Sequence, residues 1–182
     1  MLLDYIDKTV NKLIRKYKTR NPYEICDALG IHVRLLDLGV NCKAYYLPVS
    51  RIRNIVLSTR VSEPLRRVLV AHELGHDRLH YEIALLQGFH EMEMFDFIKP
   101  TEFQANMFAA ELLLDDTELF DLFNDSDSSF FGIARELDVP AALLDFKFRM
   151  LKHKGYRISP PYIVNSDFLK NEIDDYSDDE DV

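Results

Sequence analysis

The chain has 182 residues, of which 47% are hydrophobic and 29% are charged, and its formal net charge at pH 7 is −9. This length and composition are typical of one globular domain with a substantial core and a small appendage. No stretch reaches the roughly 18 consecutive apolar residues of a membrane span. The N-terminal residues carry charges throughout instead of an apolar signal segment, so we expect a cytoplasmic protein without membrane contact.

The negative charge is concentrated at the C-terminus. Residues 167–182 hold eight acidic residues and one lysine, a net charge of −7, which leaves −2 for the rest of the chain. Such a tail is typical of a solvated, disordered end. Neither part has the basic surplus of a free-standing nucleic-acid-binding protein. We therefore do not expect direct nucleic-acid binding.

The first elements along the chain are two helices. Apolar residues recur on one stripe over residues 2–18, which indicates an amphipathic helix. A short second helix follows, with Asn21 as its N-cap, Pro22 at its first position and Gly30 beyond its end.

Strand patterns follow the two helices. Three short segments rich in β-branched and aromatic residues are separated by turn-like residues. Their ranges are 31–38, 43–49 and 54–59. Because the connections are short, we expect a small, mostly antiparallel, three-stranded sheet.

The remaining elements are helical, and together with the sheet they give an α+β fold. A helix with buried-type spacing begins at Ser62, and a second strong helix covers residues 101–114. Residues 128–155 resemble a helix-turn-helix in outline, with a break at Pro140. Because the body of the chain is almost neutral, we favour a helical pair packed on the rest of the protein over a DNA-reading element.

The segment VLVAHELGHDRLH, residues 68–80, carries the strongest chemical signal. Residues four apart on a helix share one face, so His72 and His76 can direct imidazole nitrogens at one cation. Glu73 is adjacent to the first histidine and can act as a general base on water. The spacing H-E-x-x-H therefore predicts two metal ligands and a catalytic base within one helical turn, with Zn²⁺ as the expected metal. Gly75 suits close packing or substrate approach.

A catalytic zinc ion needs a third protein ligand. His80 lies a further turn along, about 6 Å down the axis, so we place it outside the metal tetrahedron, as a supporting or core histidine. Glu102 is the better candidate, because it begins the next strong helix and has Asn106 one turn later, where the amide can orient His72. The other acidic candidates are Glu91, Glu93, Asp96 and Glu111.

These two motifs together resemble one family. AHELGHDRLH, followed by EFQANMFAAELL, is similar to the ImmA/IrrE metallopeptidases over roughly residues 20–120. The resemblance implies zinc bound by His72, His76 and Glu102, with Glu73 as the catalytic base. It also implies a cytoplasmic peptidase of a phage, a mobile element or a DNA-damage response, whose substrate is a helix-turn-helix transcriptional repressor.

The sequence thus predicts a zincin-like metallopeptidase domain over 1–120, a helical C-terminal region over 121–166 and an acidic tail over 167–182. The expected activity is zinc-dependent cleavage of a repressor as a regulatory switch. The alternatives are a non-catalytic anti-repressor that binds its partner, and a DNA-binding regulator. Candidates for stabilising an oxyanion are His90, Tyr46 and Arg149.

Overall fold

The computed structural model describes residues 2–86, 100–124 and 129–157. The elements, in chain order, are α1 (Leu2–Tyr17), α2 (Pro22–Ala28), β1 (Ile31–Leu36), β2 (Ala44–Val49), β3 (Ile52–Ser58), α3 (Glu63–Leu79), α4 (Tyr81–Leu86), α5 (Pro100–Leu113), α6 (Asp116–Asn124), α7 (Phe130–Glu136) and α8 (Ala141–His153). The predicted α+β class is confirmed. In the described ranges no helix has both the length and the apolar character needed to cross a membrane.

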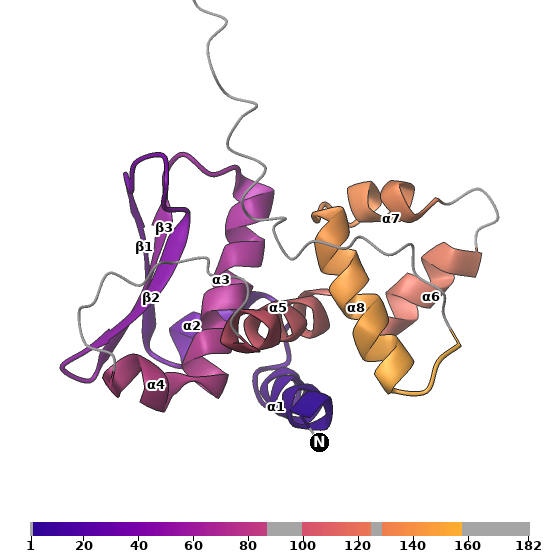
Figure 1. Ribbon diagram of the computed structural model, residues 1–182, viewed down its shortest axis with the longest axis horizontal. Helices are drawn as coiled ribbons and strands as arrows, with labels where there is room; N and C mark the ends of the chain where they lie inside the picture. The colour runs from indigo at the N-terminus through magenta and orange to yellow at the C-terminus, as the bar shows by residue number, and fades with distance from the viewer. Residues whose placement is uncertain (1, 87–99, 125–128, 158–182) are drawn as a thin grey trace, which may run out of the picture.

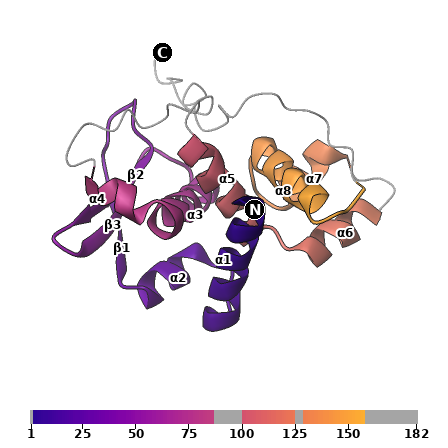
Figure 2. The same ribbon diagram turned by 60° about the horizontal axis from the view of Figure 1, so that its bottom comes forward.

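The elements form a series of layers from one side of the molecule to the other (Figure 1). The sheet stands at one side, α3 lies next to it, and α5 crosses α3 at the centre. Helices α6, α7 and α8 gather on the far side of α5. After a 60° turn, α1 is seen crossing in front of α5, between the sheet side and the α6–α8 group (Figure 2).

Local signals explain where several helices begin. The side chain of Asn21 accepts a hydrogen bond from the Tyr23 amide at 3.0 Å, and Pro22 occupies the first turn of α2, as predicted. Gly30 has φ +68°, which only glycine adopts readily, and it ends the α2 segment. Pro100 begins α5, in agreement with the preference of proline for a first helical position.

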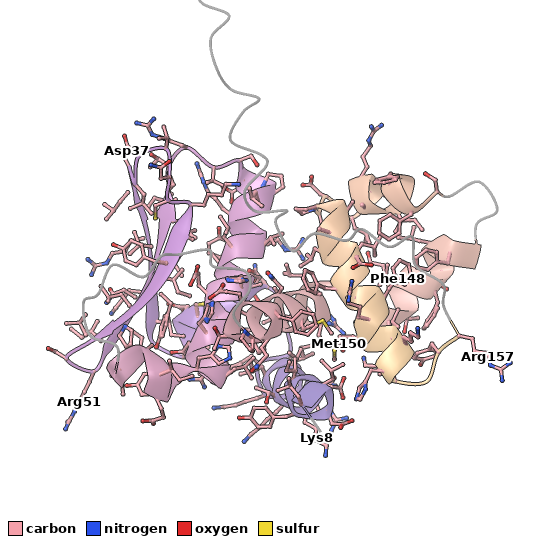
Figure 3. All side chains as sticks on the ribbon, in the orientation of Figure 1. Lys8, Asp37, Arg51, Phe148, Met150 and Arg157 are labelled. Carbon is pink, nitrogen blue, oxygen red and sulfur yellow. The ribbon has the colours of Figure 1, made fainter. Side chains whose placement is uncertain are left out.

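The sheet is mixed, which corrects the expectation of a mostly antiparallel one. Strand β3 is central: it pairs antiparallel with β2 and parallel with β1. The last four residues of β3 are buried, whereas β1 is mostly exposed, and β2 contains Pro48, which cannot donate to a neighbouring strand. The strand with the most buried residues therefore takes the position with two neighbours. Asp37 and Arg51 mark opposite ends of this sheet (Figure 3).

Close packing of α3 on α5 builds the centre of the molecule. A Cβ atom added at Gly75 would lie 3.2 Å from the Cα atom of Ala105 and 3.2 Å from the ring of Phe108. Ala109 and Ala110, also on α5, are completely buried. The glycine and the alanines thus let two helix backbones approach closely, and of the two uses predicted for Gly75 the structure shows close packing.

Aromatic side chains join the C-terminal helices to one another and join α8 to α5. Phe148 of α8 stacks near Phe123 of α6 and Phe130 of α7, with ring centroids 5.0 and 5.5 Å apart. Phe146 of α8 meets Phe103 of α5 at 5.7 Å. Helix α8 therefore buries opposite faces against different neighbours (Figure 3), unlike a recognition helix that lies open to a DNA groove.

Candidate active site

Helix α3 carries three of the predicted residues into the protein interior. His72 and Glu73 are 2% and 4% exposed. His76 follows His72 by one turn, and their ring centroids are 4.9 Å apart. A helix places residues i and i+4 on one face, so the two side chains start from neighbouring positions and extend in the same direction.

Helix α5 adds a carboxylate opposite the two histidines. Oε2 of Glu102 lies 3.1 Å from Nε2 of His72 and 3.3 Å from Nε2 of His76, and the two Nε2 atoms are 3.2 Å apart. Among the residues that the structure describes, these three form a group of potential ligands whose donor atoms all lie within 4.8 Å of one another. The structure thus brings His72, His76 and Glu102 together, as the sequence predicts.

Asn106 lies behind the first histidine. Its Oδ1 atom accepts a hydrogen bond from Nδ1 of His72 at 2.9 Å, and the amide is 1% exposed. Because an amide oxygen can only accept, it holds a proton of His72 on Nδ1, so Nε2 is the atom that remains for Glu102 or for a metal.

The electrostatics of the group favour a positive charge at the point where the donors converge. Burial opposes ionisation of Glu102, but its hydrogen bonds with the two histidines outweigh that effect and lower its pKa well below the usual range. For His72 burial also disfavours charge, yet the bonded Glu102 and the nearby Glu73 raise its pKa. Burial lowers the pKa of His76. Two imidazole nitrogens and a carboxylate are the donor set of many catalytic zinc sites, so the residues present fit a divalent metal.

Glu73 has a different environment from Glu102. Burial raises its pKa to about 7, opposed by the charge of His72, and its carboxylate accepts a hydrogen bond from the Tyr46 backbone amide. Ser58 N donates to Lys43 O at 2.7 Å, so odd-numbered positions of β2 face β3 and the Tyr46 amide faces away. The free edge of the sheet therefore reaches the carboxylate of Glu73.

The remaining candidates lie elsewhere or have other partners. Glu111, an alternative ligand, bonds Lys147 and Lys154 at the other end of α5. The hydroxyl of Tyr46 donates to Asp77, and Arg149 pairs with Asp145 on α8, so neither side chain is directed at the histidines. The candidates that fall outside the described residues are Glu91, Glu93, Asp96 and His90.

His80 lies beside His76, outside the group of potential ligands. Its Nδ1 atom is 3.1 Å from Nδ1 of His76, and its Nε2 atom is 3.1 Å from Oε1 of Gln104. Sequence reasoning missed Gln104. Gln104 lies two positions after Glu102, so it points away from the helical face that Glu102 shares with Asn106 and meets His80 at the end of α3.

Two imidazoles and a carboxylate that converge from two helices of an α+β scaffold are a donor set found in zinc peptidases. The sequence model of the M78 peptidase family, described as the IrrE N-terminal-like domain, matches residues 26–149, and the chain belongs to this family. The predicted resemblance is thereby confirmed, and membership implies a bound metal.

Two relatives carry informative names. The chain is 34% identical to "Uncharacterized immunity region protein 2" of Bacillus phage phi105 over 142 residues, which are 78% of this chain and 88% of that protein. It is 29% identical to "Metallopeptidase ImmA" of Bacillus subtilis (strain 168) over 161 residues, 84% of this chain and 89% of that protein.

Proposed function

We propose that this protein is a zinc-dependent endopeptidase of the cytoplasm that cleaves a helix-turn-helix transcriptional repressor, as a regulatory switch of a phage or mobile element. The observation that carries the proposal is the convergence of His72, His76 and Glu102, with Glu73 buried next to the first histidine. In a metallopeptidase family, this arrangement supports roles as three ligands and one base.

The ligand roles follow from the donor atoms. His72 and His76 would bind through Nε2 and Glu102 through Oε2, which already face one another. Zn²⁺ prefers such nitrogen and oxygen donors, and three protein ligands leave a position open for chemistry. When bound, the metal supplies a Lewis acid that polarises a peptide carbonyl and makes water more acidic.

Glu73 performs the proton transfers in this proposal. Its carboxylate takes a proton from the water whose oxygen attacks the carbonyl carbon, and gives the proton to the nitrogen that leaves when the C–N bond breaks. The hydrogen bond from the Tyr46 amide holds the carboxylate in position. Asn106 keeps His72 oriented through Nδ1.

The names of the relatives support the proposed substrate. One relative belongs to a phage immunity region and another is a metallopeptidase named ImmA. A peptidase in an immunity region acts most directly on the repressor that maintains immunity. A repressor encoded beside the gene for this protein is therefore the substrate to try first.

The test is incubation of the purified protein and Zn²⁺ with that repressor, followed by mass spectrometry of the fragments. We expect a small number of cuts, which a chelator abolishes and added Zn²⁺ restores. Glu73→Gln should bind Zn²⁺ normally and cleave about 10²–10⁴-fold more slowly, the range for loss of a general acid–base group.

Three results would contradict the proposal. Cleavage by Glu73→Gln at the wild-type rate would show that Glu73 is not the general base. Tight repressor binding without cleavage would favour the anti-repressor alternative. Repressor-independent DNA binding with a steep salt dependence would favour a DNA-binding regulator.

A further inference from the structure

A chain of hydrogen-bonding groups leads away from the second potential ligand. Behind His76, whose Nε2 faces Glu102, His80 Nδ1 lies 3.1 Å from His76 Nδ1, with ring centroids 5.2 Å apart. His80 ends α3 and is 6% exposed. On its other side, its Nε2 atom meets Oε1 of Gln104 on α5 at 3.1 Å. The chain Gln104–His80–His76 therefore ends at the candidate metal centre.

The donors and acceptors along this chain determine which nitrogen of each ring carries the proton. The Oε1 atom of Gln104 has only lone pairs, so Nε2 of His80 must carry the proton. A second positive charge close to a metal cation is unfavourable, so both rings are neutral with a metal bound. Nδ1 of His80 is then an acceptor, and Nδ1 of His76 must donate to it. This leaves the lone pair of His76 on Nε2, the atom that faces Glu102.

The opposite orientation of the amide would have the opposite effect. If the NH₂ group of Gln104 met His80, Nε2 of His80 would accept and its Nδ1 would donate to His76. His76 would then carry its proton on Nε2, where it blocks metal binding, because a ligating histidine must present a lone pair. The acceptor at position 104 thus determines the tautomer of His76, although Gln104 contacts His80 and not His76.

We infer that Gln104, acting through His80, is a positioning residue that holds His76 in the Nδ1-protonated tautomer able to bind a metal. The inference rests on the proposed ligand role of His76. The first histidine has a parallel arrangement, because Oδ1 of Asn106 accepts directly from Nδ1 of His72. Helix α5 thereby contributes the carboxylate of Glu102 and two amide acceptors, one for each histidine of α3.

The first test measures Zn²⁺ affinity by competition with a chelator, and the visible spectrum of the Co²⁺-loaded protein. Gln104→Met removes the acceptor at similar volume and should weaken Zn²⁺ binding about tenfold, the lower end of the 10–100-fold range for groups that support a ligand. Gln104→Glu keeps an acceptor and should stay within about threefold of wild type on the same measure, with an unchanged Co²⁺ spectrum.

A double-mutant cycle tests whether the effect passes through His80. In a His80→Phe background, Gln104→Met should cause no further loss of Zn²⁺ affinity, because the connection is already broken. His80→Gln, which restores an acceptor, should recover part of the affinity that His80→Phe loses. Equal Zn²⁺ affinity in Gln104→Met and wild type would overturn the inference. A tenfold loss of Zn²⁺ affinity from Gln104→Met in the His80→Phe background would overturn it as well.

A spectroscopic measurement separates this inference from the proposed function. Ring ¹⁵N chemical shifts of the metal-free wild-type protein, measured at a pH high enough that His76 and His80 are both neutral, should show His80 protonated on Nε2. Gln104→Met should remove that preference. A wild-type His80 protonated on Nδ1 would overturn the inference even if the protein binds Zn²⁺ and cleaves a repressor. Failure to cleave, with the His80 tautomer as expected, would contradict only the proposed function.

Discussion

The two ends of α5 each bury a carboxylate, and they balance its charge in different ways. At the C-terminal end Glu111 is 2% exposed and contacts two ammonium groups, Lys147 at 2.8 Å and Lys154 at 2.6 Å. At the N-terminal end Glu102 contacts the imidazoles of His72 and His76. The first carboxylate has permanent cations from the protein, and the second has rings that are neutral when they bind a metal.

This difference shows what separates a structural charge cluster from a metal centre on one helix. Lys147 is completely buried and also bonds Asp116 at 2.5 Å, so the cluster around Glu111 balances its charge with its own side chains. In the proposed function, a divalent cation from solution completes the group around Glu102. One end therefore ties α5 to α6 and α8, and the other remains able to bind a metal.

The largest expected effect is a loss of stability when the buried ammonium group of Lys147 is removed. Lys147→Met should lower the free energy of unfolding by about 3 kcal/mol, the low end of the ~3–5 kcal/mol range for an uncompensated buried charge, because Lys154 remains. Lys152→Met, on the exposed face of the same helix, should stay within about 0.5 kcal/mol of wild type. Urea unfolding measures both, and equal losses would show that the cluster around Glu111 does not stabilise the fold.

The second prediction compares the effect on Zn²⁺ affinity of neutralising each of the two carboxylates. Glu102→Gln should weaken Zn²⁺ binding at least about 100-fold, since even loss of a group outside the ligand shell costs 10–100-fold. Glu111→Gln should leave Zn²⁺ affinity within a few-fold of wild type, although it lowers stability. Chelator competition measures both variants. A similar loss of affinity in Glu111→Gln would place the metal elsewhere.

The third prediction concerns the close approach that brings the α5 carboxylate to the α3 histidines. Gly75→Ala gains about 1 kcal/mol of helix propensity, but its methyl group meets the backbone of Ala105 at 3.2 Å, and overpacking costs about 1–3 kcal/mol. We expect a net loss of about 1 kcal/mol in the free energy of unfolding, with weaker Zn²⁺ binding.

Gly132→Ala is the matched control for this change. Among the described residues, its added methyl group would lie 3.1 Å from the hydroxyl of Ser129, which caps α7 by accepting a hydrogen bond from the Gly132 amide. Because this contact is with a side chain and not with a backbone, the variant should stay within about 0.5 kcal/mol of wild type. Higher stability of Gly75→Ala would show that the glycine is not needed for the helix crossing.

The smallest expected effect is a pH dependence of the lysine cluster. Burial opposes ionisation of Asp116, but hydrogen bonds with Lys147 and Lys154 outweigh it and lower its pKa. A lowered folded-state pKa stabilises the protein above the unfolded value of about 4, and this contribution is lost as the pH falls below it. The free energy of unfolding should therefore fall less steeply between about pH 5 and pH 3 in Asp116→Asn. An unchanged slope would contradict the assignment.

Much of this arrangement is predictable from the sequence because it is local. Helical spacing relates His72 to His76, and the same rule relates Glu102 to Asn106. Caps and turns, such as Asn21 with Pro22, act within a few residues. The three strands also follow from their composition. The expectation of a mostly antiparallel sheet failed for one pair, because β1 lies beside β3 and runs parallel to it, and consecutive strands need not be neighbours in a sheet.

The tertiary structure decided everything that depends on which segments meet. Helical periodicity cannot tell whether Glu102 or Glu111 faces the histidines, because both lie on one strong helix, and the crossing at Gly75 selects the first. The link between Gln104 and His80 and the burial of Lys147 depend on contacts between residues at least 24 positions apart. Local rules fix the relation of side chains within a helix, whereas packing fixes which side chains of two helices come together.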